Sequence, residues 1–219
     1  WRRTGGVHSH QWVSVSVPGA SAYHFNDVCF VDANNGWIVG EKRAEPNKYQ
    51  GIVYRTTNGG LSWIDITPPV SVTGPIPTPF LKVKMAWATA IGNYVGYITG
   101  GNGVVLYSEN GGNSWVRRPS PVTTKDSISI WYNGLWMDAS DPYCRNLWVC
   151  GDAFGVVAKS TNGGASWTVS QTDAFNQTYI FPPNTATPYG TKLAFFDVDF
   201  TNPNVGHVAL SYGKIGKTT

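Results

Sequence analysis

Charged residues are scarce in this chain of 219 residues, because Lys, Arg, Asp and Glu together make up only 13% of it and the formal net charge is +3. A basic face is typical of nucleic-acid-binding proteins, so the composition does not predict that class of partner. The sequence contains no run of 18 apolar residues, so it does not predict a membrane-spanning helix. No segment has a sustained helical period either, whereas 25 Gly and 14 Pro predict many turns.

Cysteine is also rare, with three residues in the chain. Cys144 and Cys150 flank an expected turn, and two alternatives are open for them: a disulfide in an oxidising compartment, or two buried thiols. Asn176 begins an Asn-Gln-Thr glycosylation acceptor sequence. Together these features favour a secreted, extracellular or organelle-lumen location.

What the chain does contain is a repeat. Nearly the same eight residues occur three times, as TTNGGLSW, SENGGNSW and STNGGASW, and their first residues lie 52 positions apart at Thr56, Ser108 and Ser160. A partial fourth copy begins at Gly213, and Trp1-Arg2-Arg3 resembles the end of the second copy. A fixed period of this length predicts an array of similar structural units.

Each copy predicts a hairpin, because Asn-Gly tolerates the positive φ of a tight turn between two strand-like segments. The Asn side chain and the Ser or Thr hydroxyl should accept backbone N–H groups across the turn. The Trp should pack against a neighbouring unit. The residues with these expected structural roles are Thr56, Asn58, Gly60, Trp63, Ser108, Asn110, Gly112, Trp115, Ser160, Asn162, Gly164 and Trp167.

Two further strand-like segments precede each hairpin, for example DVCFV from Asp27 and WIVG from Trp37. Four short antiparallel strands in a unit of about 50 residues are typical of a propeller blade. The sequence therefore predicts an all-β fold, a β-propeller of four-stranded antiparallel blades.

The repeated pattern S/T-x-D/N-x-G-x-S/T-W resembles the Asp-box, or BNR repeat, of β-propeller proteins. The longer frame, FVDANNGWIVG followed by GIVYRTTNGGLSW, is most similar to the photosystem II assembly-factor-like (stability-factor-like) propellers. The resemblance implies Asp-box turns on the outer side of each blade. Asn58, Asn110 and Asn162 stand where this family usually has Asp, which keeps the hydrogen-bond acceptor but removes the charge. A metal at these turns is therefore not predicted.

The repeats predict a single β-propeller region over residues 1–219 with about four blades' worth of strands. The expected units are 1–25 (partial), 26–66, 82–118, 133–170 and 193–219 (partial). A closed four-bladed ring and an excerpt of a larger propeller both fit this pattern, and we favour the partial propeller.

The resemblance implies a non-catalytic protein-binding or assembly scaffold, with a protein partner or a larger assembly. Two alternatives stay open: part of a secreted glycoside hydrolase, sialidase-like or xyloglucan-degrading, with a carbohydrate ligand, and an extracellular structural or adhesive protein. The sequence favours a protein that is not an enzyme. No cofactor is predicted, because the Gly-Gly pairs belong to hairpins, and no metal, because no third ligand accompanies His8 and His10.

The candidate catalytic residues are Asp197 and Asp199, which alternate along an expected strand and should share a face opposite Phe196, Val198 and Phe200. They could place an acid and a base at the propeller axis, or they could simply bind backbone amides at a strand end.

Two other features could face a partner. Arg117 and Arg118 form a basic pair that would suit an acidic surface, with a solvated strand end as the simpler interpretation. The long Pro-rich segments between units carry aromatic residues, including Phe80, that could serve as anchors or could fold back on their own blades.

Overall fold

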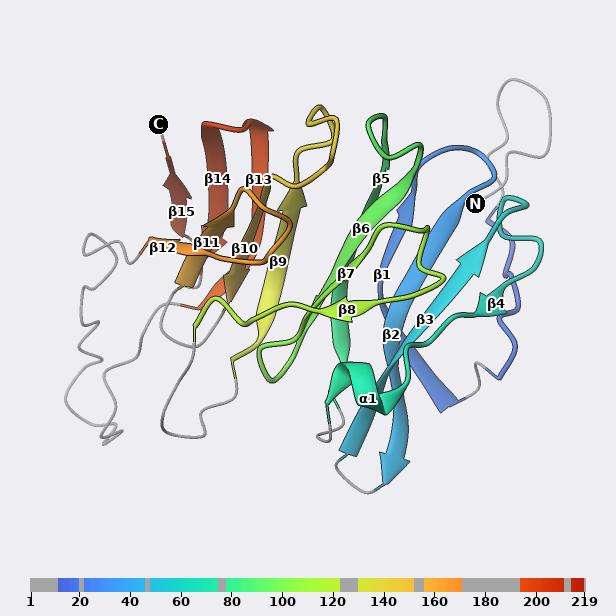
Figure 1. The fold of residues 1–219 in the computed structure, drawn as a ribbon. Helices are drawn as coiled ribbons and strands as arrows, with labels where there is room; N and C mark the ends of the chain where they lie inside the picture. The colour runs from blue at the N-terminus through green and yellow to red at the C-terminus, as the bar shows by residue number, and fades with distance from the viewer. Residues whose placement is uncertain are drawn as a thin grey trace, which may run out of the picture.

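A computed structural model describes residues 12–19, 22–45, 48–74, 78–122, 130–151, 156–170, 194–210 and 214–218. Within them the chain forms four antiparallel sheets that stand side by side (Figure 1). The first sheet contains β1 (Tyr23–Phe30), β2 (Gly36–Glu45), β3 (Lys48–Thr56) and β4 (Ile64–Asp65). The second contains β5 (Phe80–Ala88), β6 (Asn93–Gly100), β7 (Val105–Ser108) and β8 (Val116–Arg117).

The third sheet contains β9 (Tyr132–Met137), β10 (Leu147–Gly151), β11 (Val156–Ser160) and β12 (Thr168–Ser170). The fourth contains β13 (Phe195–Asn202), β14 (Val205–Leu210) and β15 (Lys214–Lys217). Strands follow one another in chain order across every sheet. The predicted all-β fold with antiparallel blades is confirmed, and the arrangement is a partial propeller.

The first strand of each sheet is its innermost one. β1 contacts β5, β5 contacts β9, and β9 contacts β13. Between successive sheets lie three hydrophobic clusters, centred on Trp37 and Val83 in the first seam, on Tyr97 and Leu135 in the second, and on Trp148 in the third. The core of this fold is therefore a series of seams between sheets, each closed by apolar side chains from both sides.

Each innermost strand carries a β-bulge near its beginning, a feature that was not expected from the sequence. The extra residues are Asn26, Leu81, Asn133 and Phe196. At two bulges the Asn side chain ties neighbouring inner strands together: Asn26 Nδ2 donates to the Phe80 carbonyl at 2.8 Å, and Asn133 Nδ2 donates to the Phe195 carbonyl at 3.2 Å. Bulges bend a strand and re-aim its side chains, and here they bring adjacent blades into contact.

A glycine stands opposite the bulge in three sheets, and its small size is required there. A Cβ on Gly40 would lie 1.9 Å from the His24 carbonyl oxygen, and one on Gly100 would lie 2.2 Å from that of Pro79. Gly151 approaches the carbonyl of Trp131 in the same way. In the fourth sheet the equivalent position is Leu210, which pairs with Phe195.

The Pro-rich connection between the first two sheets contains the short helix α1 (Val70–Thr73), and β5 begins after it at Phe80. Phe80 is fully buried in the first seam. It is therefore a core residue, so of the two alternatives for Phe80 the structure excludes the exposed anchor and shows packing within the chain. Among the described residues, no helix is long and apolar enough to cross a membrane.

Candidate functional site

The three repeat turns, Thr56–Trp63, Ser108–Trp115 and Ser160–Trp167, share one hydrogen-bond pattern. In the first, Gly60 N donates to Thr56 Oγ1 at 3.0 Å, and Ser62 N donates to Asn58 Oδ1 at 3.0 Å. The Thr56 hydroxyl donates to Asn58 Oδ1 at 2.9 Å, and Asn58 Nδ2 donates to Ser62 Oγ at 2.8 Å. The second and third turns repeat these bonds. The Asn and hydroxyl side chains thus bind the turn's own backbone, as expected.

Both glycines of each turn have positive φ, for example +69° at Gly59 and +83° at Gly60, a region that L-residues rarely adopt. Gly59 N, Gly111 N and Gly163 N then donate to carbonyls in the turn or strand start that joins the first two strands of the same sheet, at 2.9, 2.9 and 3.0 Å. The polar groups of the turns are thus engaged in hydrogen bonds within the same sheet. These residues form scaffold, and the described residues hold no cluster of His, Cys, Asp or Glu that could bind a metal.

The repeat tryptophans pack into the seams. Trp115 is buried in the first seam beside Trp37, whose Nε1 donates to the Gly111 carbonyl at 3.0 Å. Trp167 is half-buried against the second seam, and its Nε1 donates to the Pro119 carbonyl at 2.9 Å. Trp63 is buried in a separate cluster on the outward face of the first sheet. Trp115 and Trp167 thus pack against a neighbouring sheet, whereas Trp63 packs against residues of its own sheet and of the segment before β1.

The candidate aspartates Asp197 and Asp199 share a face of β13, because they pair with Ala209 and His207 on β14. Phe196 is the bulge residue and is 53% exposed, whereas Val198 and Phe200 are buried. The expectation that Phe196 shares a face with Val198 and Phe200 is wrong, since the bulge takes Phe196 out of the alternation.

The aspartates of the inner strands are engaged in structural bonds. Asp197 Oδ1 accepts from Val198 N at 3.0 Å, and Oδ2 lies 3.3 Å from Lys82 Nζ. Asp27, at the equivalent position of β1, accepts from Val28 N at 3.0 Å and from Val83 N of the second sheet at 2.9 Å. These contacts match the interpretation of aspartates that bind backbone amides, and Asp199 is exposed on the outward face of the fourth sheet.

Cys144 and Cys150 are both free and buried. Cys144 lies in the second seam and Cys150 in the third. Burial raises the pKa of the Cys144 thiol to about 11 and that of Cys150 to about 12. The disulfide that was one of the two alternatives is not formed in this structure, and the buried thiols are. Asn176 lies outside the described residues, so its glycosylation stays a prediction.

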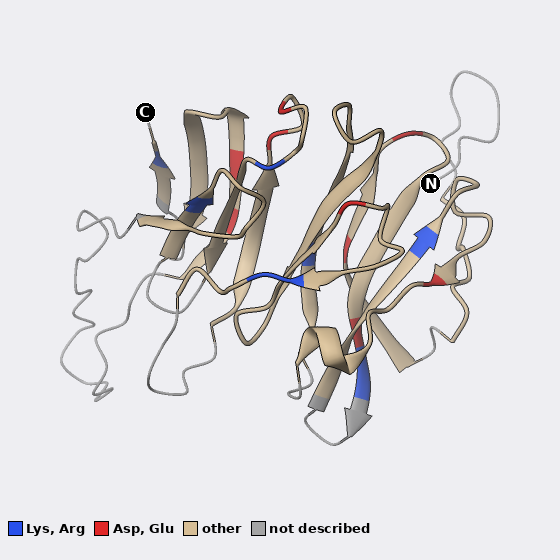
Figure 2. Cartoon of the chain, viewed as in Figure 1, with Lys and Arg blue, Asp and Glu red and all other residues tan. Residues whose placement is uncertain are grey.

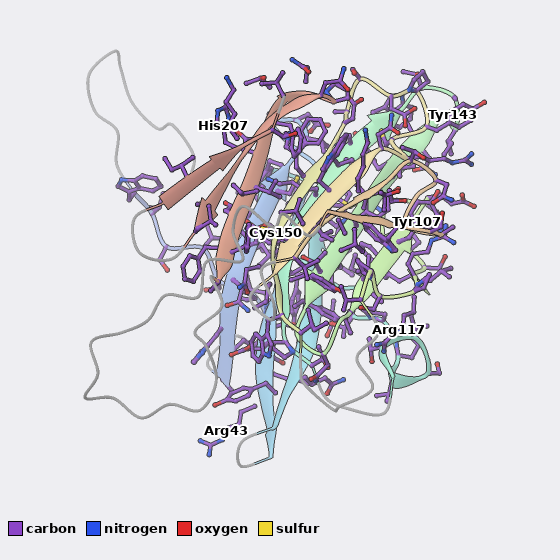
Figure 3. The ribbon with its side chains drawn as sticks, turned by 90° about the vertical axis from the view of Figure 1, so that its left-hand side faces the viewer. Arg43, Tyr107, Arg117, Tyr143, Cys150 and His207 are labelled. Carbon is purple, nitrogen blue, oxygen red and sulfur yellow. The ribbon has the colours of Figure 1, made fainter. Side chains whose placement is uncertain are left out.

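Two arginine–tyrosine pairs lie on the outer part of the second and third sheets, and we call them the arginine–tyrosine surface: the buried Tyr107 with the half-buried Arg118, and the exposed Tyr143 with the exposed Arg145. The guanidinium carbon of Arg118 is 4.4 Å from the Tyr107 ring centroid, and that of Arg145 is 4.8 Å from the Tyr143 ring centroid. Both are in the range of cation–π contacts. Figure 3 shows Tyr107 and Tyr143 along the same side of the molecule, away from His207.

The two arginines flank the third repeat turn. Gly163 N donates to the Arg145 carbonyl, and a Cβ on Gly164 would lie 3.2 Å from Arg118 Cγ. The Arg118 side chain therefore lies across the glycines of this turn. Its Nε is buried without a hydrogen-bond partner among the described residues, while Arg145 and Tyr143 are exposed. The exposed guanidinium of Arg145 could receive a carboxylate of a partner.

Two acidic residues adjoin this surface: Asp141 accepts from Tyr143 N at 3.1 Å and from Arg145 N at 2.7 Å, and Glu109 lies beside Tyr107. The Tyr107 hydroxyl donates to Glu109 Oε2 at 3.2 Å. Burial, and then the Glu109 charge, raise the pKa of Tyr107, while Arg145 and Arg118 act in the opposite direction. Figure 2 shows Lys, Arg, Asp and Glu of the described residues scattered over the sheets. Binding of a partner here would therefore depend on a few individual side chains and not on the electrostatic field of a large charged face.

The sequence indicated only part of this surface. The pair Arg117–Arg118 was a candidate basic strip, but the structure separates its members: Arg117 donates to the Thr73 carbonyl beside α1, and Arg118 lies over Tyr107. Tyr107, Tyr143 and Arg145 come from other segments and carry no shared sequence pattern. Only the fold brings them together.

Comparison with known proteins gives three findings. The family described as photosynthesis system II assembly factor YCF48 matches residues 5–119. The photosystem II assembly lipoprotein Ycf48 of Synechococcus sp. (strain CC9902) is 27% identical over 180 residues, which cover 77% of this chain and 46% of that protein. The chain thus spans about half the length of this curated relative.

Two solved structures share the fold. One, described as YCF48 bound to D1 peptide, superposes with a TM-score of 0.51 at 15% identity and covers 97% of this chain and 82% of its own. The other, YCF48 from Cyanidioschyzon merolae, has a TM-score of 0.51 at 18% identity and covers 93% of this chain and 69% of its own. At these identities the likeness shows the fold alone.

Proposed function

The chain belongs to the family of the photosynthesis system II assembly factor YCF48, and from this membership we propose that it is a non-catalytic scaffold that binds a protein partner during assembly of a larger complex. One solved structure of similar fold is described as YCF48 bound to D1 peptide. We propose that this chain, too, binds a peptide segment of a membrane-protein complex. The name of the curated relative, a photosystem II assembly lipoprotein, supports a place of action at a photosynthetic membrane, on its lumenal or otherwise extracytoplasmic side.

The arginine–tyrosine surface supports this proposal. Tyr and Arg are enriched among the residues that dominate binding energy at protein interfaces. Arg118 is oriented by the Tyr107 ring and the third repeat turn, so it loses less conformational freedom on binding than a free surface arginine. Arg145 and Tyr143 are exposed beside it. We propose that a carboxylate of the partner peptide lies between the two guanidinium groups.

The engagement of the inner-strand aspartates supports a scaffold over a hydrolase. Glycoside hydrolysis requires two carboxylates free to act as acid, base or nucleophile. Asp27 and Asp197 each accept a backbone N–H, and Asp197 also contacts Lys82. Among the described residues, no observation favours the hydrolase, carbohydrate-binding or adhesive alternatives.

The test is binding of a fluorescently labelled D1 peptide, followed by anisotropy, to the protein and to single variants. Arg145→Ala should weaken binding about tenfold, which is about 1.4 kcal/mol, and Arg118→Ala should weaken it at least as much. Arg43→Ala is the matched control. Arg43 is an exposed arginine on β2 in the first sheet, and Figure 3 shows it far from Tyr107 and Tyr143. Equal affinities for all three variants would contradict the assignment of the binding site to the arginine–tyrosine surface. If the unaltered protein did not bind the peptide, the proposal that this chain binds a D1 peptide would be wrong.

A further inference from the structure

The second sheet extends further than its neighbours at the end of the molecule where the repeat turns lie. In the first and third sheets the pairing of the two inner strands ends at Phe30–Gly36 and at Met137–Leu147. The equivalent pair of the second sheet is Met85–Gly96, and three more pairs follow it: Ala86–Val95, Trp87–Tyr94 and Ala88–Asn93. The extension therefore carries an aromatic pair, Trp87 and Tyr94, beyond the end of the neighbouring hairpins.

The neighbouring segments hold this extension in place from several sides. Ala90 N, in its turn, donates to the Pro142 carbonyl of the loop between β9 and β10 at 3.0 Å. The Tyr94 hydroxyl donates to Asp32 Oδ2 of the turn between β1 and β2, also at 3.0 Å. Gly111 N of the second repeat turn donates to the Tyr94 carbonyl at 2.9 Å. Side chains on an element fixed in this way lose little conformational freedom when they bind a partner.

Three aromatic rings form a row that leads from the first seam to the surface. Trp37 is fully buried, Tyr94 is half-buried and Trp87 is 49% exposed. The ring centroids of Trp37 and Tyr94 are 5.4 Å apart, and those of Trp87 and Tyr94 are 5.1 Å apart with an angle of 79° between the ring planes. Such edge-to-face contacts are favourable. The Trp87 and Tyr94 rings therefore stand nearly perpendicular to each other, with the Trp87 ring open to solvent.

Asp32 places a negative charge beside these rings. It is exposed, and its Oδ1 accepts the backbone N–H groups of Asn34 and Asn35 at 2.7 and 2.8 Å. These bonds lower the pKa of Asp32 to about 2, so the carboxylate is ionised at neutral pH. The Tyr94 side chain connects the two parts of the site, because its ring contacts Trp87 and its hydroxyl reaches Asp32.

One cation, Arg55, acts on the same tyrosine. Its guanidinium carbon lies 5.3 Å from the Trp37 ring centroid, and its Nη1 donates to Asn113 Oδ1 at 3.4 Å. Burial, and then the hydrogen bond to Asp32 and its charge, raise the pKa of Tyr94, whereas Arg55 lowers it. Asp32 thus has the larger effect at Tyr94, and the charge there favours a positively charged ligand.

We propose that Trp87, Tyr94 and Asp32 form a binding site for a lysine or arginine side chain of the protein partner. The methylene groups of that side chain would lie on the Trp87 ring, and its cation would lie beside the Tyr94 ring and the Asp32 carboxylate. Aromatic rings attract such cations, and long basic side chains bury their methylene groups on apolar surface. A sugar would instead need free hydrogen-bonding groups, whereas both Asp32 oxygens already accept hydrogen bonds. The inference rests on the proposed function only in taking the partner to be a protein.

An NMR titration with a short model peptide tests the site directly. The probe is the peptide GSKSG, acetylated and amidated at its ends, and its match is the same peptide with norleucine in place of lysine. The indole N–H signal of Trp87, identified by its loss in Trp87→Phe, should shift saturably with the lysine peptide. The norleucine peptide should bind about threefold more weakly, because it keeps the methylene groups but not the charge.

Two variants separate the charge from the ring. Asp32→Asn should weaken binding of the lysine peptide about threefold. Asp199→Asn is its matched control, because it removes the same charge from an exposed aspartate on β13 in the fourth sheet, and it should leave the affinity unchanged. In Trp87→Ala the backbone N–H signal of Tyr94 should no longer shift saturably. The dispersion of the same spectra shows that each variant is folded.

Several results would overturn the inference. Equal affinities for the lysine and norleucine peptides would show an apolar contact only, and equal affinities for Asp32→Asn and Asp199→Asn would show that the carboxylate takes no part. A saturable shift with cellobiose but not with the lysine peptide would assign the rings to a carbohydrate. If the lysine peptide left the Trp87 signal unchanged while the D1 peptide still bound at the arginine–tyrosine surface, this inference would be wrong and the proposed function would stand.

Discussion

The outer turns and the inner strands of this molecule repeat in different ways. The outer turns repeat residue for residue, and the bond from the second glycine N–H to the Thr or Ser hydroxyl is 3.0, 2.9 and 2.8 Å long in the three copies. The inner strands repeat the bulge but not the bulged residue, which is Asn, Leu, Asn and Phe in turn. The Asn and hydroxyl side chains of a turn bond within its own eight residues, whereas a bulge must suit whichever sheet lies beside it.

The largest expected effect comes from the inner strands. Gly40→Ala places a Cβ 1.9 Å from the His24 carbonyl oxygen, and two backbone segments would have to separate. We expect a loss of about 3 kcal/mol or more in the free energy of unfolding, measured by urea denaturation. Gly92→Ala is the control, because Gly92 has a φ of +69° but nothing within 4 Å of its Cβ position. It should cost only the conformational strain, about 1–2 kcal/mol.

The outer turns should respond less, through one buried hydrogen bond. Ser108→Ala leaves Gly112 N, which is buried, without its acceptor at 2.9 Å. Loss of a buried partner costs about 1–3 kcal/mol, and the same denaturation experiment measures it. Ser114→Ala in the same turn removes an exposed hydroxyl and should cost clearly less. If both substitutions had equal effects, the turn would not depend on its buried member.

The contact between Lys82 and Asp197 should make a smaller contribution to the stability of the inner strands. Its N–O distance is 3.3 Å, but the Asp197 side chain is 57% exposed. Solvent screens such a pair, so a double-mutant cycle with Lys82→Met and Asp197→Asn should give about 0.2–1 kcal/mol. The coupling should fall further at high salt. A coupling that is independent of salt would show that the pair acts by packing and not by charge.

The turn between β1 and β2, to which the first repeat turn is bound, should make the free energy of unfolding depend on pH in acid. Backbone N–H groups of Asn35 and Asn34 lower the pKa of Asp32 from 3.8 to about 2. A carboxyl whose pKa is lower in the folded state contributes stability above pH 3.8, and this is lost as the pH falls toward 2. Asp32→Asn should flatten this part of the curve of unfolding free energy against pH. A curve for Asp32→Asn that matches the curve of the unaltered chain between about pH 2 and pH 4 would contradict this prediction.

The smallest effect is expected from Asn110→Asp. The carboxylate keeps the acceptor for Ser114 N and the Ser108 hydroxyl, and its second oxygen can accept from the Ser114 hydroxyl, which now receives a bond from Asn110 Nδ2. The unfolding free energy should change by less than about 0.5 kcal/mol at neutral pH. A change several times larger would mean that the amide group is specifically required in this turn.

The fold was predictable because its strongest signals are local. Asn-Gly turns, short β-rich segments and a fixed period predicted the sheets, and the turn hydrogen bonds followed from side-chain chemistry. The bulges were not predictable, since a bulged Asn26 and a bulged Leu81 share no residue type. Nor was the arginine–tyrosine surface, because Tyr107, Arg118 and Arg145 meet only after the second and third sheets pack together.

The pair Lys82–Asp197 has a consequence for how the molecule unfolds. Lys82 is on β5 and Asp197 on β13, so the contact joins the second and fourth sheets past the third. On the intervening strand Gly134 lies against Asp197, where a Cβ would come within 2.9 Å of the Asp197 Cα. Repeat arrays with contacts only between neighbours can lose their end units one at a time. The contact between Lys82 and Asp197 joins two sheets that are not adjacent. It should therefore couple the unfolding of the fourth sheet to that of the second, so that the sheets unfold more nearly as one unit.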